Sequence, residues 1–379
     1  MDMYFPLGLE EEFQLIDSES YQLRPYIHPL LEKGISCFGN HIKAECFQSM
    51  VELITGIHQN ISTLGDEVYT QRASLAHLVQ DDSVALLSAG LHPTSAWQDQ
   101  LITENERYYA IENEQREVGR SNVYFGLHVH IGIQDQETMI ALINQARTWL
   151  PHLLALSANS PFFEGRLTGF KAYRPILRAR AFYRQGIPAI YSSWADLERY
   201  LDSLTAVGLI KGCRDIWWDI RPHLIYNTIE IRICDMPLTL EDTLSIAALC
   251  QALIAKLFWL HHRGKSVAIL PREYIEENKW RAARDGMAAT LIDFSNARSI
   301  SMCDAIGELL AFVEDVLDDL GSREQLQQLS AKLNQEPLTG ADHQIAIYQQ
   351  TGDFRQVIQF LMQQTMGNLS STTSPPLPY

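Results

Sequence analysis

The chain has 379 residues, of which 46% are apolar and 20% charged, a balance typical of a globular protein with a large core. Its formal net charge of −16 argues against nucleic acid and anionic membrane surfaces as partners, but not against nucleotides that bring magnesium. We see no signal peptide and no uncharged apolar run of about 18 residues, and six scattered cysteines without a CxxC pair predict reduced thiols in a cytoplasmic protein.

The first predicted element is a strand over 8–16, which holds three consecutive glutamates inside an apolar run. Because side chains alternate between the faces of a strand, Glu10 and Glu12 share one face while Glu11 points with the leucines. Two like charges about 4 Å apart repel by roughly 4 kcal/mol at an effective dielectric of about 20. We therefore expect a cation against the face of Glu10 and Glu12, although a solvated edge strand explains this stretch equally well.

The remaining elements follow from periodicity and from turn and cap signals. Strands are predicted near 42–46, 50–55, 83–90, 124–133, 214–222 and 227–234. Helices are predicted over 62–81, over 137–157 with a bend at Pro151, and over 240–262 with Thr239 as N-cap, and the pattern stays almost entirely helical from 239 onward. The predicted fold is α+β: one domain over 1–368 with a largely antiparallel sheet, helices on one face and a polar active-site face, followed by a disordered tail over 369–379.

Three further strands also set polar side chains opposite apolar ones. His128 and His130 share one face of the strand over 124–133, flanked by glycines that leave space in front of them. Arg221 lies on the strand over 214–222, and Glu230 and Arg232 share a face of the next strand. One such strand indicates an exposed salt bridge, but four together indicate a concave polar site. If that site binds a metal, glutamates dominate its ligands, which favours magnesium or manganese over zinc.

Two other features have both a simple and a functional interpretation. Glu45 and Glu52 stand beside apolar residues, and each taken alone is more simply a surface residue. The segment 164–184 carries six cationic residues against the single Glu164. Arginine suits bidentate contacts with phosphate or carboxylate, so this segment predicts an anion pocket. A solvated basic loop remains the alternative for about half of its side chains.

Together these residues resemble the carboxylate–amine ligases related to glutamate–cysteine ligase, within the glutamine-synthetase-like superfamily. The matching stretches include Gly-Leu-Glu-Glu-Glu-Phe at 8–13, Gly-Leu-His-Val-His-Ile-Gly-Ile at 126–133, Trp-Trp-Asp-Ile-Arg-Pro-His at 217–223 and Thr-Ile-Glu-Ile-Arg-Ile at 228–233. Shorter matches lie at 90–93 and 106–108, and a longer one at 150–170. Ala172 departs from the family pattern, which usually has serine there, and this loosens the assignment of substrate contacts in that loop.

The resemblance implies roles for the polar side chains. Six of them would hold two Mg²⁺ ions, for which Mn²⁺ can substitute: Glu12, Glu45 and Glu52 around one ion, and Glu10, His128 and Glu230 around the other. Arg232 would face the phosphate being transferred and act with Glu230 as a catalytic residue. We assign substrate carboxylates to Arg174 and Arg221 as a hypothesis. Glu11 has no role in this scheme.

The implied reaction is ATP-dependent amide formation through an acyl phosphate, with release of ADP and phosphate. The partners would be ATP and small amino acids, glutamate and cysteine in the nearest family members, and a homodimer is the oligomer that base rates favour. Two alternatives stay open: a metal-dependent hydrolase or oxygenase built on the histidines and carboxylates, and a catalytically silent relative that binds a nucleotide. The intact set of six ligands weighs against the silent relative. The sequence leaves the amine and the carboxylate substrate undetermined.

Overall fold

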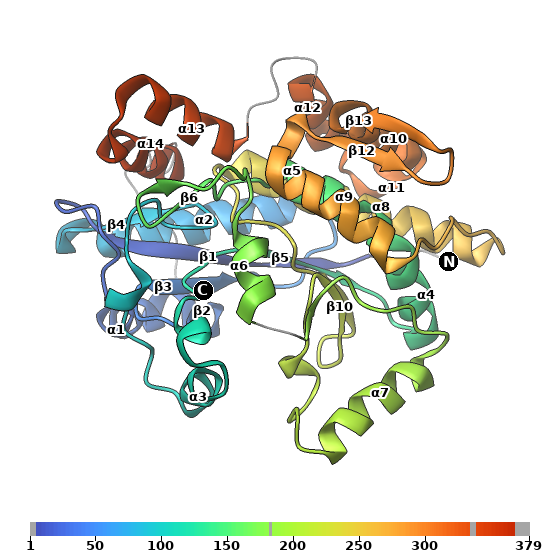
Figure 1. The fold of residues 1–379 in the computed structure, drawn as a ribbon, viewed down its shortest axis with the longest axis horizontal. Coiled ribbons are helices and arrows are strands. Elements are labelled where there is room, and N and C mark those ends of the chain that lie inside the picture. Colours follow the sequence, from blue (N-terminus) through green and yellow to red (C-terminus); the bar gives the residue numbers. More distant parts are fainter. Residues whose placement is uncertain (1–4, 182–183, 334–338, 368–379) are drawn as a thin grey trace.

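The computed structural model describes residues 5–181, 184–333 and 339–367, so the tail with the predicted disorder lies outside the described residues. Seven strands form one antiparallel sheet in the order β10-β11-β5-β1-β3-β2, in which β4 also pairs with β1 (Figure 1). These strands are β1 (Leu7–Asp17), β2 (Ile42–Ala44), β3 (Met50–Ile54), β4 (Val84–Leu87), β5 (Leu127–Gly132), β10 (Ile220–His223) and β11 (Thr228–Ile231). The arrangement confirms the predicted α+β class.

Helices cover the apolar face of this sheet, where the alternating leucines of β1 become part of the core. Leu9 lies in one apolar cluster with Leu64 of α2 and Leu249 of α8, and Phe13 lies in a second cluster with Leu361 of α14. The helices that contribute to these two clusters are α1 (Ile27–Phe38), α2 (Ile61–Val79), α4 (Gln136–Ala146), α5 (Leu150–Leu156), α7 (Trp194–Ala206), α8 (Leu240–His262), α9 (Arg272–Asp285), α10 (Met302–Val313), α11 (Leu317–Leu320), α12 (Arg323–Leu333), α13 (Gly340–Thr351) and α14 (Phe354–Met366).

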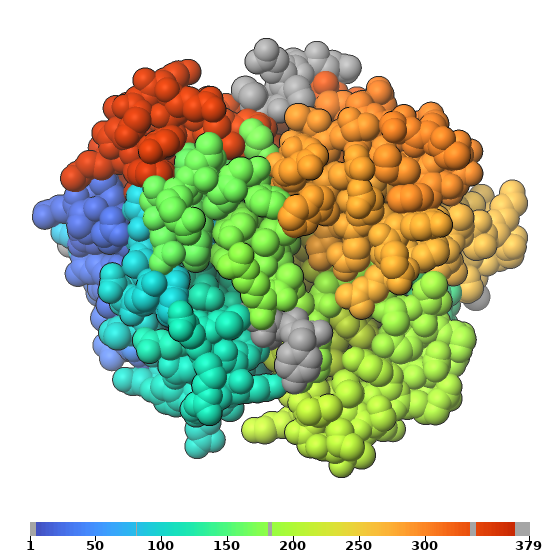
Figure 2. Space-filling view, in the orientation of Figure 1, coloured from blue at the N-terminus to red at the C-terminus, as the bar shows by residue number. Residues whose placement is uncertain are grey.

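Two other helices are α3 (Glu106–Arg120) and α6 (Arg174–Ala181). In Figure 1, α6 crosses in front of β1 and β5. Figure 2 shows this face of the molecule, and on it α3 and α6 contact one another. Two-stranded sheets complete the fold: β6 (Phe162–Phe163) with β7 (Arg166–Leu167), β8 (Gln185–Gly186) with β9 (Trp217–Trp218), and β12 (Thr290–Asp293) with β13 (Arg298–Ser301).

Several predicted boundaries are refined by the structure. The predicted helix over 137–157 is interrupted by a 3₁₀ turn at Arg147–Trp149, and Pro151 lies in the first turn of α5, where its missing N–H costs no helical hydrogen bond. The predicted N-cap is confirmed, since Thr239 Oγ1 accepts the backbone N–H of Asp242 at 3.2 Å. The prediction of an almost entirely helical C-terminal part overlooked the hairpin formed by β12 and β13.

Helix α8 is long and apolar enough to cross a membrane by length and composition alone. However, 78% of its most apolar window is buried inside the protein. It packs against α2, α4 and the central strand β5. Its apolar character is therefore explained by its position as the core helix beneath the sheet.

Glu11 points into this helical layer, as the alternation of β1 predicts. Its carboxylate forms a bidentate ion pair with Arg72 of α2, with Nε 3.1 Å from Oε2, and both side chains are only 2% exposed. Thr243 of α8 donates to the same carboxylate at 3.2 Å. Glu11, the middle glutamate of the acidic strand, is thus a buried structural group on the face opposite Glu10 and Glu12.

Candidate functional site

Strand register brings the polar residues of five strands to one face of the sheet. Glu10 stands opposite His128, and Glu12 stands opposite Glu52. Glu230 lies between His130 on one side and Arg221 on the other. Because directly opposed side chains lie about 4.5–5.5 Å apart, this pairing forces the carboxylates and imidazoles into contact. Residues far apart in the chain therefore form one cluster at the centre of the sheet.

Most of this cluster lines a pocket with a volume of about 420 Å³, although Glu230 and His130 are not part of the pocket lining. The glutamates in its lining are Glu10, Glu12, Glu45 and Glu52. They are outnumbered by cations, which are Lys43, Arg107, Arg174, Arg178, Arg214, Arg221 and Arg232. The two signs of charge lie next to one another, since Lys43 stands directly opposite Glu52. The pocket can therefore hold both cations and the anionic groups of a ligand.

The clustered carboxylates and imidazoles meet the geometric requirement for a divalent cation. One ligand atom from each of Glu10, Glu52 and His128 lies within 4.8 Å of the others, and Glu10, His130 and Glu230 form a second such group. His128 Nδ1 lies 2.8 Å from Glu10 Oε2, and His130 Nε2 lies 3.4 Å from Glu10 Oε1. Carboxylate oxygens supplemented by imidazole suit magnesium or manganese.

The ionisation of these carboxylates reflects their crowding. Burial, together with the charges of Glu12 and Glu10, raises the pKa of Glu45 from 4.5 to about 7. Burial and the neighbouring carboxylates also raise the pKa of Glu52 well above its ordinary value. Burial alone would raise the pKa of Glu10, but hydrogen bonds and charge from His128 and His130 bring it well below 4.5. Protonation of Glu45 and Glu52 therefore reduces the electrostatic repulsion among the clustered carboxylates. A bound divalent cation could reduce the same repulsion instead.

Glu230 is held mainly by arginines. Its side chain is 1% exposed, Arg221 donates to its two oxygens at 2.6 and 3.2 Å, and Arg232 forms a further ion pair with it. These charges bring the pKa of Glu230 below its ordinary value despite the opposing effect of burial. Whereas the family resemblance grouped Glu230 with His128, the structure places Glu230 directly opposite His130.

Only part of the basic segment 164–184 reaches the pocket. Arg174 and Arg178 line it from α6, and both guanidinium groups lie over the ring of Tyr124. Arg174 is 1% exposed and donates to the carbonyl of Ile233 at 3.2 Å. It fills the space beside Gly126, where a Cβ would lie only 2.1 Å from its Nη2. Arg166 and Arg180 are exposed, so the solvated-loop interpretation holds for them.

Helix α3 adds residues to which the sequence gave no role. Tyr108 Oη donates to the carbonyl of Ala44 at 3.3 Å and lies 3.5 Å from Glu45 Oε2. Arg107 lines the same pocket and donates to the carbonyl of Arg214 at 3.4 Å. The only sequence feature that pointed to these two residues was the short family match at 106–108, to which we had assigned no function.

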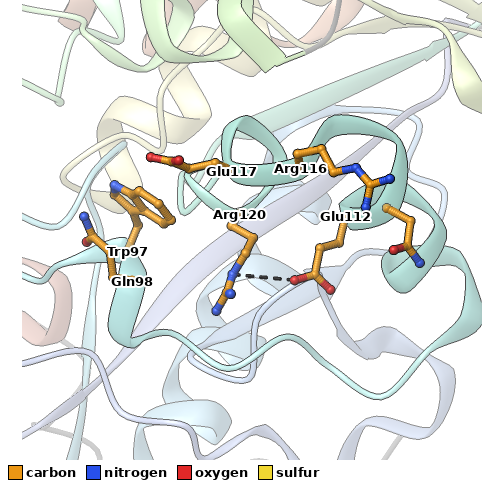
Figure 3. Close-up of a pocket in the computed structure, with 7 residues that line it drawn as sticks. Trp97, Gln98, Glu112, Arg116, Glu117 and Arg120 are labelled. Carbon is orange, nitrogen blue, oxygen red and sulfur yellow. Dashed lines mark ion pairs between the residues drawn. The ribbon is translucent and has the colours of Figure 1, made fainter.

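The opposite face of α3 forms a larger, open hollow of about 670 Å³ with Trp97 and Gln98 (Figure 3). Arg120 and Glu112 face one another there at 3.5 Å. Glu117 extends toward Trp97 and Arg116 extends in the other direction, and both also line the hollow. The hollow has neither the crowded carboxylates nor the buried arginines of the sheet pocket. Size alone therefore does not identify the reactive site, and the chemistry favours the smaller pocket.

Comparison with known proteins agrees with the family resemblance seen in the sequence, and the match extends over almost the whole chain. The model of glutamate–cysteine ligase family 2 (GCS2) matches residues 6–359. A protein of Solibacter usitatus, provisionally named glutamate–cysteine ligase 2, is 42% identical over 360 residues, covering 95% of this chain and 93% of the relative. A relative of the same name from Sorangium cellulosum is 41% identical over 367 residues, covering 96% of this chain and 97% of its own length.

Solved structures of low sequence identity share the fold. A glutamate–cysteine ligase from Francisella tularensis, solved in complex with AMP, gives a TM-score of 0.70 at 14% identity and covers 98% of this chain and 90% of its own. A bifunctional glutathione synthetase from Pasteurella multocida gives a TM-score of 0.67 at 15% identity and covers 97% of this chain and 53% of its own.

Proposed function

The chain belongs to glutamate–cysteine ligase family 2, and we propose that it is an ATP-dependent carboxylate–amine ligase that forms an amide bond and releases ADP and phosphate. The observation that carries the proposal is the pocket in which clustered glutamates face a set of arginines. The AMP bound by the Francisella tularensis ligase is consistent with a nucleotide in the same fold. A cytoplasmic location and a homodimer stay predictions.

The proposed metal ligands remain those expected from the family pattern: Glu10, Glu12, Glu45, Glu52, His128 and Glu230. The crowding of Glu10 and Glu52 around His128 supports a cation at that point. His130 joins the candidates because it shares a group with Glu10 and Glu230. When bound, Mg²⁺ would neutralise the triphosphate and stabilise charge on the phosphoryl group being transferred.

In the proposed reaction, one oxygen of a substrate carboxylate attacks the γ-phosphorus of ATP and ADP departs. The amine of the second substrate then attacks the acyl carbon, phosphate leaves, and the amine loses a proton. Arg232, fixed by Glu230, supplies a charged donor toward the transferred phosphoryl group. Its position beside the carboxylate cluster favours this role over a purely structural one.

We also propose that one of the arginines that line the pocket binds a carboxylate group of the substrate. Arg174 and Arg221 are the residues suggested by the sequence, but Arg221 already makes a bidentate pair with Glu230. Arg178 is 4% exposed, its Nε has no partner among the described residues, and its two other nitrogens donate only to backbone carbonyls. We therefore add Arg178 to Arg174 as a candidate for this contact.

ADP release in a screen of amino-acid pairs tests the proposed function. We expect Mg²⁺-dependent ADP formation with one pair, and glutamate plus cysteine is the first pair to measure. Protein that binds ATP and Mg²⁺ but releases no ADP with any pair would instead be a silent relative. Protein that retains zinc or iron and ignores ATP would favour the hydrolase or oxygenase alternative.

Magnesium is expected to stabilise the fold more strongly at higher pH. The folded pKa of Glu45, about 7, lies above its ordinary value of 4.5, so without metal the stability from this group is full below pH 4.5 and is lost as the pH rises toward 7. A bound cation offsets that loss. The difference in Tm with and without Mg²⁺, measured by scanning calorimetry, should therefore be larger at about pH 8 than at about pH 5. Equal differences at the two pH values would contradict this account.

A further inference from the structure

An aromatic pair stands at the edge of the proposed active-site pocket. The rings of His223 and Tyr226, at the turn between β10 and β11, are stacked with centroids 4.4 Å apart and an interplanar angle of 11°. Both residues line the pocket, and Tyr226 remains 54% exposed despite the stacking. The phenol ring therefore rests on the imidazole and still presents apolar surface to a ligand.

The turn holds this pair in place. His223 and Thr228 are paired across the hairpin, and Asn227 closes the turn with a φ of 51°. The backbone N–H of Tyr226 donates to Nδ1 of His223 at 3.3 Å, which requires that nitrogen to be unprotonated. Burial lowers the pKa of His223 to about 4, so its ring is neutral at physiological pH. The hairpin thus presents an uncharged, preorganised stack.

Only one imidazole ring separates the stack from the glutamates. His130 contacts His223 and Tyr226 edge to face, with centroids 5.4 and 6.0 Å away. The Nε2 atom of the same ring lies 3.4 Å from Glu10 Oε1, and the His130 side chain is only 9% exposed. A ligand that reaches from the carboxylates across His130 therefore arrives at the stacked pair.

We propose that the His223–Tyr226 stack is the platform on which the base of the nucleotide substrate lies. This inference rests on the proposed function, because it requires a triphosphate bound with metal at the glutamates. A nucleotide held there must place its base one ribose and one phosphate chain away. Tyr108, Tyr124 and Trp217 also line the pocket, but the first two are half-buried and the third is buried. Tyr226 is 54% exposed and therefore offers a free ring face to a base. Aromatic rings bind bases through their π-faces with little dependence on base identity.

Calorimetric titration of the full chain tests the platform without relying on turnover. The probes are ATP and inorganic tripolyphosphate, each with Mg²⁺, because tripolyphosphate carries the phosphates without the base. Loss of one stacking partner typically weakens base binding by roughly 5- to 100-fold. Tyr226→Ala is expected to raise the Kd for ATP by that factor while leaving the Kd for tripolyphosphate within about twofold. Tyr226→Phe should bind ATP like the wild type.

Ile225→Ala is the matched control, because Ile225 is 57% exposed in the same turn and is absent from the pocket lining. It should bind both probes normally. Unchanged ATP affinity in Tyr226→Ala would overturn the platform, as would an equal loss for ATP and tripolyphosphate, which would indicate damage to the glutamate cluster. Failure of the wild type to bind ATP at all would instead overturn the proposed function, and the platform with it.

Discussion

Glu12→Gln is expected to reduce ADP release by about 100-fold or more without unfolding the protein. The amide keeps the size of the side chain, and its oxygen can still accept the backbone N–H of Gly126, as the carboxylate does. It loses one oxygen ligand and the negative charge opposite Glu52, both of which the proposed divalent cation would use. ADP release measured with saturating Mg²⁺ and the best amino-acid pair is the readout.

The stability of the same variant separates a metal ligand from a structural group. The charge of Glu12 contributes to the raised pKa values of Glu45 and Glu52, so its removal relieves repulsion in the metal-free protein. The metal-free Tm of Glu12→Gln should therefore equal or exceed that of the wild type, whereas its gain in Tm on adding Mg²⁺ should shrink. Glu117→Gln, on the exposed outer side of α3, is the control and should change neither quantity (Figure 3). Wild-type turnover in Glu12→Gln would remove this residue from the proposed ligands.

The faces of the central strands were predictable from sequence, while their register was not. Alternation alone placed Glu10 with Glu12, and Glu230 with Arg232, on the polar side. That Glu12 meets Glu52 depends on how β3 aligns with β1, and a shift of one residue would have turned every side chain to the other face. The local sequence pattern carries no information on that alignment, so Glu52 became a candidate metal ligand only through the family resemblance.

The pocket residues that come from helices above the sheet were the hardest to predict from the sequence. Tyr108 and Arg107 lie on α3, which was not among the predicted elements, and they reach the pocket only because this helix packs across the open face. Glu11 shows the same limitation on the other face, because its partner Arg72 lies 61 residues away in the chain. Long-range packing, which determines these contacts, leaves no periodic trace in the sequence.

That buried pair gives the second large expected effect. Removing one partner of a buried ion pair leaves an uncompensated charge and typically costs about 3–5 kcal/mol. Glu11→Leu is therefore expected to lower the free energy of unfolding by about that amount, because Arg72 would remain charged beneath the sheet at 2% exposure. Arg72→Met should cost a similar amount, since Glu11 would keep only the hydrogen bond from Thr243. Urea unfolding followed by circular dichroism measures both.

The double variant Glu11→Leu/Arg72→Met distinguishes an anchor from a catalytic group. Replacing both charges with apolar side chains removes the unpaired charge, so the double variant should recover most of the stability that each single variant loses. If Glu11 serves only to hold β1 against α2 and α8, ADP release should recover together with stability, because Glu10 and Glu12 again point into the pocket. Recovery of stability without recovery of ADP release would instead mean that the charge of Glu11 influences the carboxylate cluster on the other face of β1.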